Sequence, residues 1–307
     1  MLRSIKERVK ESIKTYLESQ EKQAKVLGNE IEKELNLLDE TNQKKSIVGQ
    51  AVRFCPSHIH LSDPYVRENF GALSRGYDEE NIYKEFISLI RDYTMVTYDG
   101  LISLCDIVRN CEQKGITGDF AEAGVWKGGA TALMSLVSSK FGNKPRMIHA
   151  FDSFIGLPEP IGEKDFDVRY LNMEETFKIS KEESRGNLRP INALCAEKET
   201  FRKLLVDKIG HPTDKLMIYE GWFQDTIPKA IDKIEELAIL RLDGDLYDSY
   251  RISLEYLYPK VKTGGFVIID DWCIGGCRKA IQEYFAARGG VPFMSTVDIT
   301  GRYFIKP

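Results

Sequence analysis

The chain has 307 residues, of which 42% are hydrophobic and 29% are charged, and its formal net charge is −4. This size is sufficient for one large core with an appendage, and the slightly negative charge provides no net attraction to nucleic acid. No apolar run approaches the ~20 residues that span a bilayer, and the first residues lack a signal-peptide core. We therefore expect a cytoplasmic protein that binds neither nucleic acid nor membranes.

Residues 1–78 are expected to form a helical and loop-rich N-terminal extension, followed by the main domain over residues 79–307. Within the N-terminal extension, apolar residues recur at intervals of three and four, which indicates amphipathic helices. One group of these apolar residues resembles a short coiled-coil seam and consists of Ala24, Leu27, Ile31, Leu35 and Leu38. This apolar seam could pack against a second copy of the chain or against the chain's own main domain. We favour the first, which makes the protein a homo-oligomer. His58 and His60 are candidate metal ligands, but a surface or lid position is preferred.

Helices are predicted over residues 79–93 and 98–112, and a glycine-rich turn follows the next strand. That strand ends at Glu122, the turn contains Gly124, Gly128 and Gly129, and a helix starts at about Ala130. Glycines allow a ligand to approach the backbone closely. Because the pattern is neither Gly-x-Gly-x-x-Gly nor a phosphate loop with Gly-Lys-Ser/Thr, we expect a nucleoside rather than a bound phosphate.

A second strand over residues 146–151 ends in Asp152, which lies 152 − 129 = 23 residues after the last glycine of the turn. This is the usual offset of an acid that binds ribose hydroxyls, and an acid there rejects a 2′-phosphate. The polar stretch 157–194 is either a lid over the site or an ordinary solvated loop. After a third strand over 215–220, Gly221 permits close approach to adenine, and Trp222 covers the ring or packs in the core.

Two apolar runs, 236–242 and 265–269, are expected to be buried strands of a parallel sheet. Asp243 follows the first run, and Asp270 and Asp271 follow the second. Because ligands bind at the carboxyl ends of such strands, the three carboxylates should converge, and their mutual repulsion calls for a cation. Oxygen ligands favour Mg2+, with Mn2+ or Ca2+ as substitutes. The alternative is that these acids cap helices.

The six cysteines are scattered along the chain, and we expect reduced, buried thiols. Cys273 and Cys277 are spaced as half of a zinc site. With only four histidines in the chain and no second cysteine pair at a suitable spacing, we disfavour zinc.

Taken in order, several motifs resemble the macrocin O-methyltransferase family, whose enzymes use S-adenosylmethionine and magnesium to methylate sugar hydroxyls on macrolide antibiotics. The matching motifs are Thr94-Met95, Gly118-Asp119, Glu122-Ala-Gly-Val-Trp-Lys-Gly-Gly129, Asp152-Ser-Phe-Ile-Gly-Leu-Pro158, Glu220-Gly-Trp-Phe-Gln-Asp-Thr-Ile-Pro228, Asp243-Gly-Asp-Leu-Tyr-Asp-Ser249 and Asp270-Asp271. The resemblance covers residues 94–306, roughly two thirds of the chain. It implies an α/β fold with a doubly wound, seven-stranded Rossmann-like methyltransferase sheet.

The resemblance also implies the ligands. We expect S-adenosylmethionine to contact Thr94, Glu122, Ala123, Gly124, Trp126, Gly128, Asp152, Ser153, Gly221, Trp222 and Asp243. Magnesium is expected at Asp243, Asp270 and Asp271.

The expected activity is metal-dependent O-methylation of a hydroxyl, on a sugar of a glycosylated natural product or glycan. Asp243 is the candidate proton acceptor, with Asp245 as the alternative. No Ser-His-Asp or Cys-His order suggests covalent catalysis. Two other classes are weighed: a non-catalytic scaffold or binding protein, and an NAD-dependent oxidoreductase. Neither gives the three aspartates a function, and the glycine spacing does not fit the oxidoreductase.

Overall fold

The computed structural model describes residues 79–160, 163–165, 188, 190–191 and 193–307. The expected N-terminal extension, the amphipathic helices predicted in it and the histidines at 58 and 60 lie outside the described residues, as does most of the stretch 157–194. The expectations for those segments remain predictions.

A single seven-stranded sheet forms the centre of the described region, with the strand order β3-β2-β1-β4-β5-β7-β6. The strands are β1 (Asp119–Ala123), β2 (Ile148–Asp152), β3 (Leu216–Glu220), β4 (Leu237–Leu242), β5 (Val261–Ile269), β6 (Ser295–Thr296) and β7 (Arg302–Ile305). The first five are parallel, and β7 runs antiparallel to both β5 and β6. The chain order reverses between β1 and β4, where doubly wound sheets bind their ligands. The predicted seven-stranded, doubly wound sheet is confirmed.

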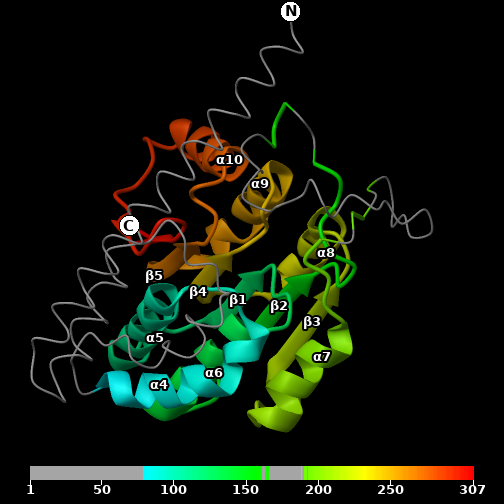
Figure 1. Ribbon diagram of the computed structural model, residues 1–307. Coiled ribbons are helices and arrows are strands. Elements are labelled where there is room, and N and C mark those ends of the chain that lie inside the picture. Colours follow the sequence, from blue (N-terminus) through cyan, green and yellow to red (C-terminus); the bar gives the residue numbers. More distant parts are fainter. Residues whose placement is uncertain (1–78, 161–162, 166–187, 189, 192) are drawn as a thin grey trace, which may run out of the picture. The chain divides into compact units, whose positions relative to one another are not determined.

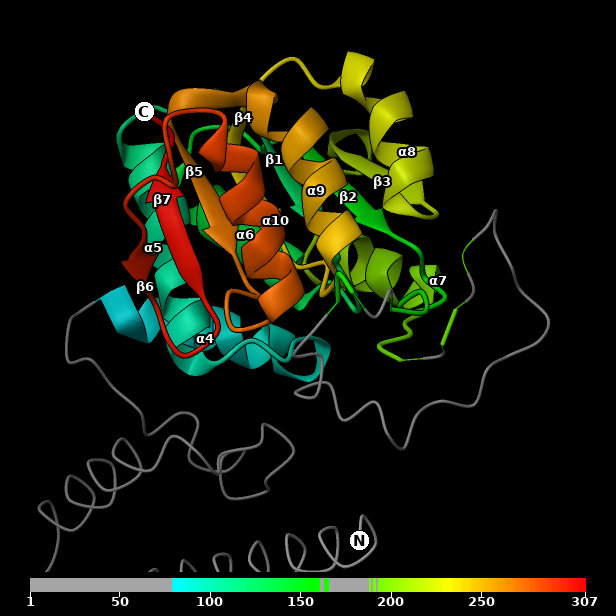
Figure 2. The ribbon, with the colours of Figure 1, turned by 90° about the horizontal axis from the view of Figure 1, so that it is seen from above.

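Helices cover both faces of this sheet, with α4, α5 and α6 on one face and α8, α9 and α10 on the other (Figures 1 and 2). Their bounds are α4 (Glu79–Ile90), α5 (Tyr98–Gln113), α6 (Gly129–Phe141), α7 (Lys198–Arg202), α8 (Phe223–Ala230), α9 (Tyr247–Tyr256) and α10 (Gly275–Ala286). A π-helical segment, Lys203–Lys208, continues α7, and short 3₁₀ turns lie at Arg91–Tyr93, Thr213–Lys215, Ile231–Lys233 and Tyr258–Lys260. None of the helices in the described part is long and apolar enough to cross a membrane.

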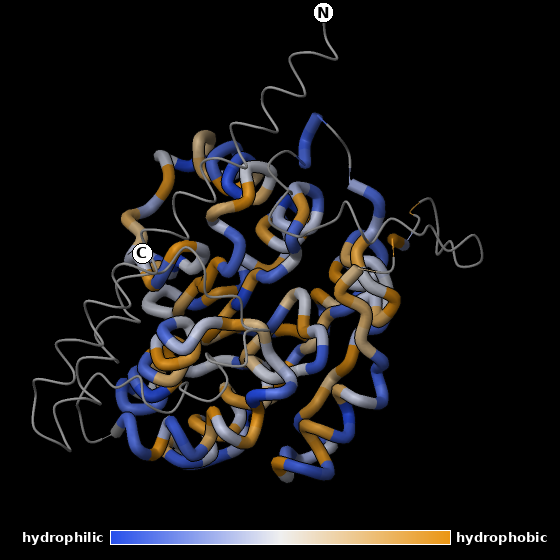
Figure 3. Tube along the Cα trace, viewed as in Figure 1, coloured by the Kyte–Doolittle hydropathy of each residue, from blue (hydrophilic) through white to orange (hydrophobic). Residues whose placement is uncertain are grey.

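The hydrophobic core lies between the sheet and its helices, and hydrophobic residues are concentrated along the strands (Figure 3). Every residue of β4 is buried. The strand predicted over 265–269 begins earlier, at Val261, and its register with β4 shifts between Leu237 and Ile239, where the extra residues of β5 are accommodated. Apart from Arg241, the residues of the buried strand β4 are apolar, and the acidic residues follow at its carboxyl end, at the edge of the sheet.

The described cysteines are free thiols, as expected. Cys105, Cys111 and Cys277 are buried, Cys273 is partly buried and Cys195 is exposed, so the expectation that all are buried was wrong for Cys195 and Cys273. Cys195 sits in the loop after Leu194, which leaves its sulfur near the surface while it donates to the carbonyl of Ile155 at 3.1 Å.

Candidate active site and metal centre

A pocket opens at the carboxyl ends of β1, β2 and β4, the edge at which the sequence places its candidate residues. It brings together seven of them, which are Gly124, Trp126, Asp152, Ser153, Trp222, Asp243 and Asp245. Along the chain, about 30 residues separate the glycine turn from the acid at the end of β2, and about 90 more separate that acid from the acids after β4; the parallel sheet brings all of them to one edge.

The glycine turn passes directly over the end of β4. Gly124 has φ +96°, and a Cβ added there would lie 1.6 Å from the carbonyl oxygen of Asp243. The backbone N–H of Asp243 donates to the carbonyl of Ala123 at 2.9 Å, and that of Gly124 donates to Phe151 at 2.9 Å. Glycine is therefore required where the glycine turn meets the end of β4.

Asp152 holds this turn in place with its carboxylate. Oδ2 accepts from the backbone N–H groups of Val125 (2.9 Å) and Trp126 (2.8 Å), and Oδ1 accepts from that of Phe154 (2.7 Å). Trp126 has φ +48°, a conformation that needs such support outside glycine. Burial raises the pKa of Asp152, while the three N–H groups act in the opposite direction. Asp152 lines the pocket, so it can reach a ribose, but it also supports the turn itself.

Trp222 borders the same pocket from the N-terminus of α8. Its side chain is buried, and its indole Nε1 has no hydrogen-bond partner within the described residues. Because buried indole N–H groups normally find an acceptor, a ligand in the pocket is the natural partner. Gly221, with φ +136°, precedes it, and its N–H donates to the carbonyl of Asp152 at 2.8 Å.

Five predicted cofactor residues lie outside the lining of this pocket: Thr94, Glu122, Ala123, Gly128 and Gly221. Thr94 packs against the start of α6, where a Cβ on Gly129 would lie 2.6 Å from the Cβ of Thr94. Gly128 is the N-cap of α6 and packs against Phe201. Thr94 and Gly128 therefore contribute to packing at the start of α6.

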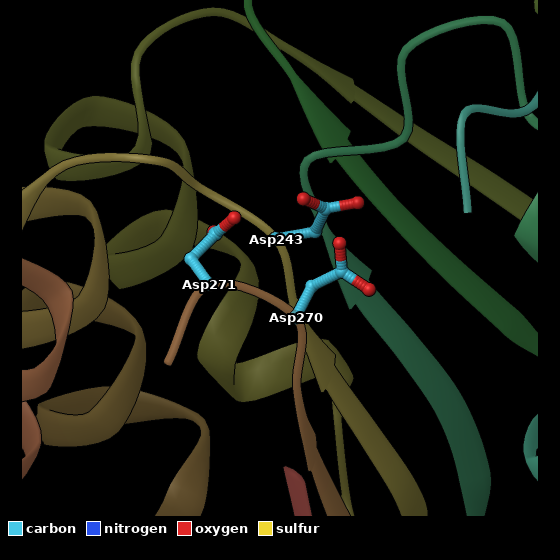
Figure 4. A group of neighbouring side chains, drawn as sticks. All are labelled: Asp243, Asp270 and Asp271. Carbon is cyan, nitrogen blue, oxygen red and sulfur yellow. The ribbon is translucent and has the colours of Figure 1, made fainter. Parts of the chain in front are cut away.

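The carboxylates of Asp243, Asp270 and Asp271 meet at the ends of β4 and β5. One oxygen of each lies within 4.8 Å of the others, and Figure 4 shows Asp243 and Asp270 side by side with Asp271 across from them. The structure thus brings together the three acids that the sequence predicts as metal ligands.

Each of these acids has one oxygen held by the protein. Arg241 donates from Nη1 to Oδ2 of Asp243 at 2.6 Å and from Nη2 to Oδ1 of Asp270 at 2.5 Å. Oδ2 of Asp271 accepts from the N–H of Asp245 at 2.9 Å and from the hydroxyl of Tyr250 at 3.0 Å. Within the described part of the chain, the second oxygen of each carboxylate makes no hydrogen bond. Three oriented, available oxygens form a donor set that suits a hard divalent cation.

The electrostatics of the acids are consistent with such a site. Burial and the neighbouring carboxylates raise the pKa of Asp270 to about 7, although Arg241 opposes the shift. Burial and the carboxylates of Asp245, Asp243 and Asp270 raise the pKa of Asp271 well above its usual value. Groups of like charge in a buried position disfavour ionisation unless a cation compensates them.

Asp245 lies on the tight turn after β4, with φ +58°. Burial, followed by the charges of Asp243 and Asp270, raises the pKa of its carboxyl well above the usual value. Both candidate proton acceptors, Asp243 and Asp245, border the pocket.

Sequence reasoning missed Arg241, whose guanidinium lies among these acids and is almost completely buried. The signal was a lone charged residue inside an apolar strand. Sequence reasoning also missed the outer wall of the pocket, which includes Met95, Gln224 and Arg251. The Arg251 guanidinium is paired with Asp248 at 3.2 Å and Glu255 at 3.0 Å.

Comparison with known proteins gives a consistent result. A family described as macrocin-O-methyltransferase (TylF) matches residues 24–306. The chain is 33% identical over 215 residues to 8-demethyl-8-(2,3-dimethoxy-alpha-L-rhamnosyl)-tetracenomycin-C 4'-O-methyltransferase of Streptomyces olivaceus, covering 69% of this chain and 75% of that enzyme. It is 32% identical over 270 residues to demethyldecarbamoylnovobiocin O-methyltransferase of Streptomyces niveus, covering 86% of this chain and 95% of that enzyme.

Among solved structures, the O-methyltransferase NovP superposes with a TM-score of 0.62 at 26% identity, covering 75% of this chain and 99% of that chain. The calicheamicin methyltransferase CalS11 superposes with a TM-score of 0.51 at 15% identity, covering 87% of this chain and 94% of that chain, which indicates a shared fold.

Proposed function

The chain belongs to the macrocin-O-methyltransferase family, and from this premise we propose that it methylates a sugar hydroxyl of a glycosylated natural product in a reaction that requires a divalent cation. It is an S-adenosylmethionine-dependent O-methyltransferase, as its relatives are. The sugar acceptor is inferred from the tetracenomycin relative, whose printed name specifies a rhamnosyl substrate. The observation that supports the cation most strongly is the convergence of three carboxylates beside the cofactor pocket.

The proposed cofactor site consists of the residues that line the pocket. S-adenosylmethionine supplies an electrophilic methyl group on a sulfonium. The turn at Gly124 lets it approach the backbone, Asp152 offers a carboxylate to its ribose, and Nε1 of Trp222, which has no partner among the described residues, offers a hydrogen bond. These contacts fix the cofactor so that an acceptor oxygen can be held in line with the methyl group, and positioning of this kind accounts for much of the catalysis.

The proposed metal ligands are Asp243, Asp270 and Asp271, and Mg2+ is the expected ion, with Mn2+ or Ca2+ as substitutes. A divalent cation there supplies a Lewis acid that makes a sugar hydroxyl more acidic. A vicinal diol would offer two oxygens for the cation, which favours a sugar ring as acceptor. The enzyme's own task is to hold the three carboxylates at a fixed spacing, and the hydrogen bonds to Arg241 and Tyr250 do so.

One of two aspartates is proposed to accept the hydroxyl proton. Asp243 has Oδ2 bonded to Arg241, whereas the carboxylate of Asp245 makes no hydrogen bond within the described region and borders the pocket. Asp243 is also a proposed metal ligand, so Asp243→Asn should lose Mn2+ binding and turnover whichever aspartate is the base. Asp245→Asn decides between them: it should retain Mn2+ binding, and loss of its turnover would assign the proton to Asp245, whereas retained turnover would assign it to Asp243.

The test of the proposed function uses the purified full chain with S-adenosylmethionine and a panel of acceptors. The panel contains demethyldecarbamoylnovobiocin, other glycosides with a free vicinal diol, and their aglycones. Methyl transfer to a glycoside should disappear in excess chelator and return with Mg2+, and Asp271→Ala should lose turnover while binding S-adenosylhomocysteine nearly as tightly. Full turnover in chelator would contradict the metal requirement, and transfer to aglycones alone would contradict the sugar acceptor.

The family assignment favours methyl transfer over the oxidoreductase and scaffold alternatives. Self-association through residues 1–78 remains part of the proposal on the basis of their apolar spacing.

A further inference from the structure

Arg241 and Glu122 occupy neighbouring positions of the central sheet. They are paired in register between β4 and β1, so their side chains lie on the same face. Side chains alternate along a strand, so Asp243, two residues after Arg241, lies on that face as well. Arg241 pairs with Ile268 of β5, and Asp270 follows Ile268 by two residues. Asp270 therefore lies on the same face. The backbone register therefore places one guanidinium among three carboxylates.

The contacts of Arg241 use both ends of its planar fork. Nη1 donates to Oε1 of Glu122 and to Oδ2 of Asp243, each at 2.6 Å, while Nη2 donates to Oδ1 of Asp270 at 2.5 Å. The side chains of Arg241 and Glu122 are 2% and 1% exposed, so water cannot replace these bonds. A fork of this shape orients carboxylates as well as compensating their charge, and a lysine ammonium cannot do both.

Glu122 in turn is connected to the cofactor side of the site. The hydroxyl of Thr131, in the first turn of the helix that follows the glycine turn, donates to Oε2 of Glu122. Both carboxylate oxygens of Glu122 are thereby occupied within the protein, and Glu122 does not line the pocket. The expectation that Glu122 contacts S-adenosylmethionine thus has no support from this geometry.

We infer that Arg241 is a positioning residue, anchored by Glu122, that presents Asp243 and Asp270 to the cation with one oxygen each. This inference rests on the proposed metal-dependent function. It deepens that function by assigning the geometry of two of the three ligands to a single buried guanidinium. A hydrogen-bonding partner behind a metal ligand typically affects metal affinity by about 10–100-fold.

The competing explanation is that Arg241 serves only as a counter-charge for buried acids. Arg241→Lys distinguishes the two, because it keeps the positive charge and removes the fork. Glu122→Asp is the second variant, because it keeps the negative charge and withdraws it by one methylene from Arg241. Arg146→Lys is the matched control. Arg146 makes a similar two-pronged pair with Glu112, at 2.8 Å for each prong, away from the metal ligands.

Mn2+ affinity is measured by electron paramagnetic resonance titration of the full chain, alongside S-adenosylhomocysteine affinity by calorimetry and thermal unfolding. Arg241→Lys is expected to weaken Mn2+ binding by about 10–100-fold and to change S-adenosylhomocysteine binding by less than about threefold. Glu122→Asp should weaken Mn2+ binding by at least about threefold. If Arg241→Lys does not fold, this variant alone tests whether Arg241 positions the two ligands. Arg146→Lys should lower the unfolding temperature and leave Mn2+ affinity unchanged.

If folded Arg241→Lys binds Mn2+ as tightly as the wild type, the inference is overturned and the proposed function is left intact. If Arg241→Lys does not fold, the same result in Glu122→Asp has the same meaning. Failure of the wild-type protein to bind Mn2+ would overturn both.

Discussion

The glycine turn lies directly against the end of β4 at Gly124, and Gly124→Ala should disturb both segments. Gly115→Ala is the matched comparison, because Gly115 also has a positive φ, +62°, and no atom lies within 4 Å of the position its Cβ would take. A left-handed conformation costs an alanine roughly 1–2 kcal/mol. Reduced freedom of the unfolded chain offsets about 0.4–1 kcal/mol of this. Gly115→Ala should therefore cost between about 0 and about 1.6 kcal/mol.

At Gly124 the added Cβ would lie 1.6 Å from the carbonyl oxygen of Asp243, and ordinary contact begins at 3.4 Å. One backbone must therefore move by about 3.4 − 1.6 = 1.8 Å. Overpacking of this kind typically costs about 1–3 kcal/mol, so Gly124→Ala should cost about 1–5 kcal/mol in total, which is about 1–3 kcal/mol more than Gly115→Ala. Because the displaced atom belongs to a metal ligand, Mn2+ affinity should fall as well.

Urea unfolding of the two variants measures the stability difference, and Mn2+ titration of the folded proteins measures the effect on the site. Gly115→Ala should bind Mn2+ as the wild type does. Equal stability losses in the two variants, together with wild-type Mn2+ affinity in Gly124→Ala, would refute the reasoning.

Four further predictions concern other parts of the chain. Asp152→Ala should weaken S-adenosylhomocysteine binding by about 1–3 kcal/mol and lower the urea midpoint, since three backbone N–H groups lose their acceptor. An unchanged S-adenosylhomocysteine affinity in calorimetry would show that Asp152 does not bind the cofactor. Trp222→Phe should weaken the same binding by about 0.5–1.5 kcal/mol through loss of its N–H, and an unchanged affinity would show that the indole donates to no ligand. Burial lowers the pKa of His211, so the unfolded chain binds the proton more readily and stability should be lost as the pH falls below about 6.5; urea midpoints at pH 7.5 and 5.5 should differ less in His211→Gln than in the wild type, and an equal difference would contradict this. Deletion of residues 1–45 should lower the mass in light scattering and spare cofactor binding, whereas an unaltered mass would argue against self-association through them.

Much of this site follows from the sequence alone, because it depends on local features. An apolar run ending in an acid marks the carboxyl end of a buried strand, and parallel strands bring such ends to one edge. Asp152, Asp243, Asp270 and Asp271 could therefore be assigned to that edge without coordinates. The glycine turn was equally visible, since its spacing and its position before a helix are local properties.

The partners of each side chain were decided only by the tertiary structure. Arg241 is one charge in an apolar strand, and its pairing with Glu122 and Asp270 depends on the register of β4 against β1 and β5. The binding of the turn's N–H groups by Asp152 likewise depends on how β2 ends beside β1. Local sequence determines which face and end of a strand a residue occupies, whereas hydrogen bonds between strands depend on a register set by the packing of the whole sheet.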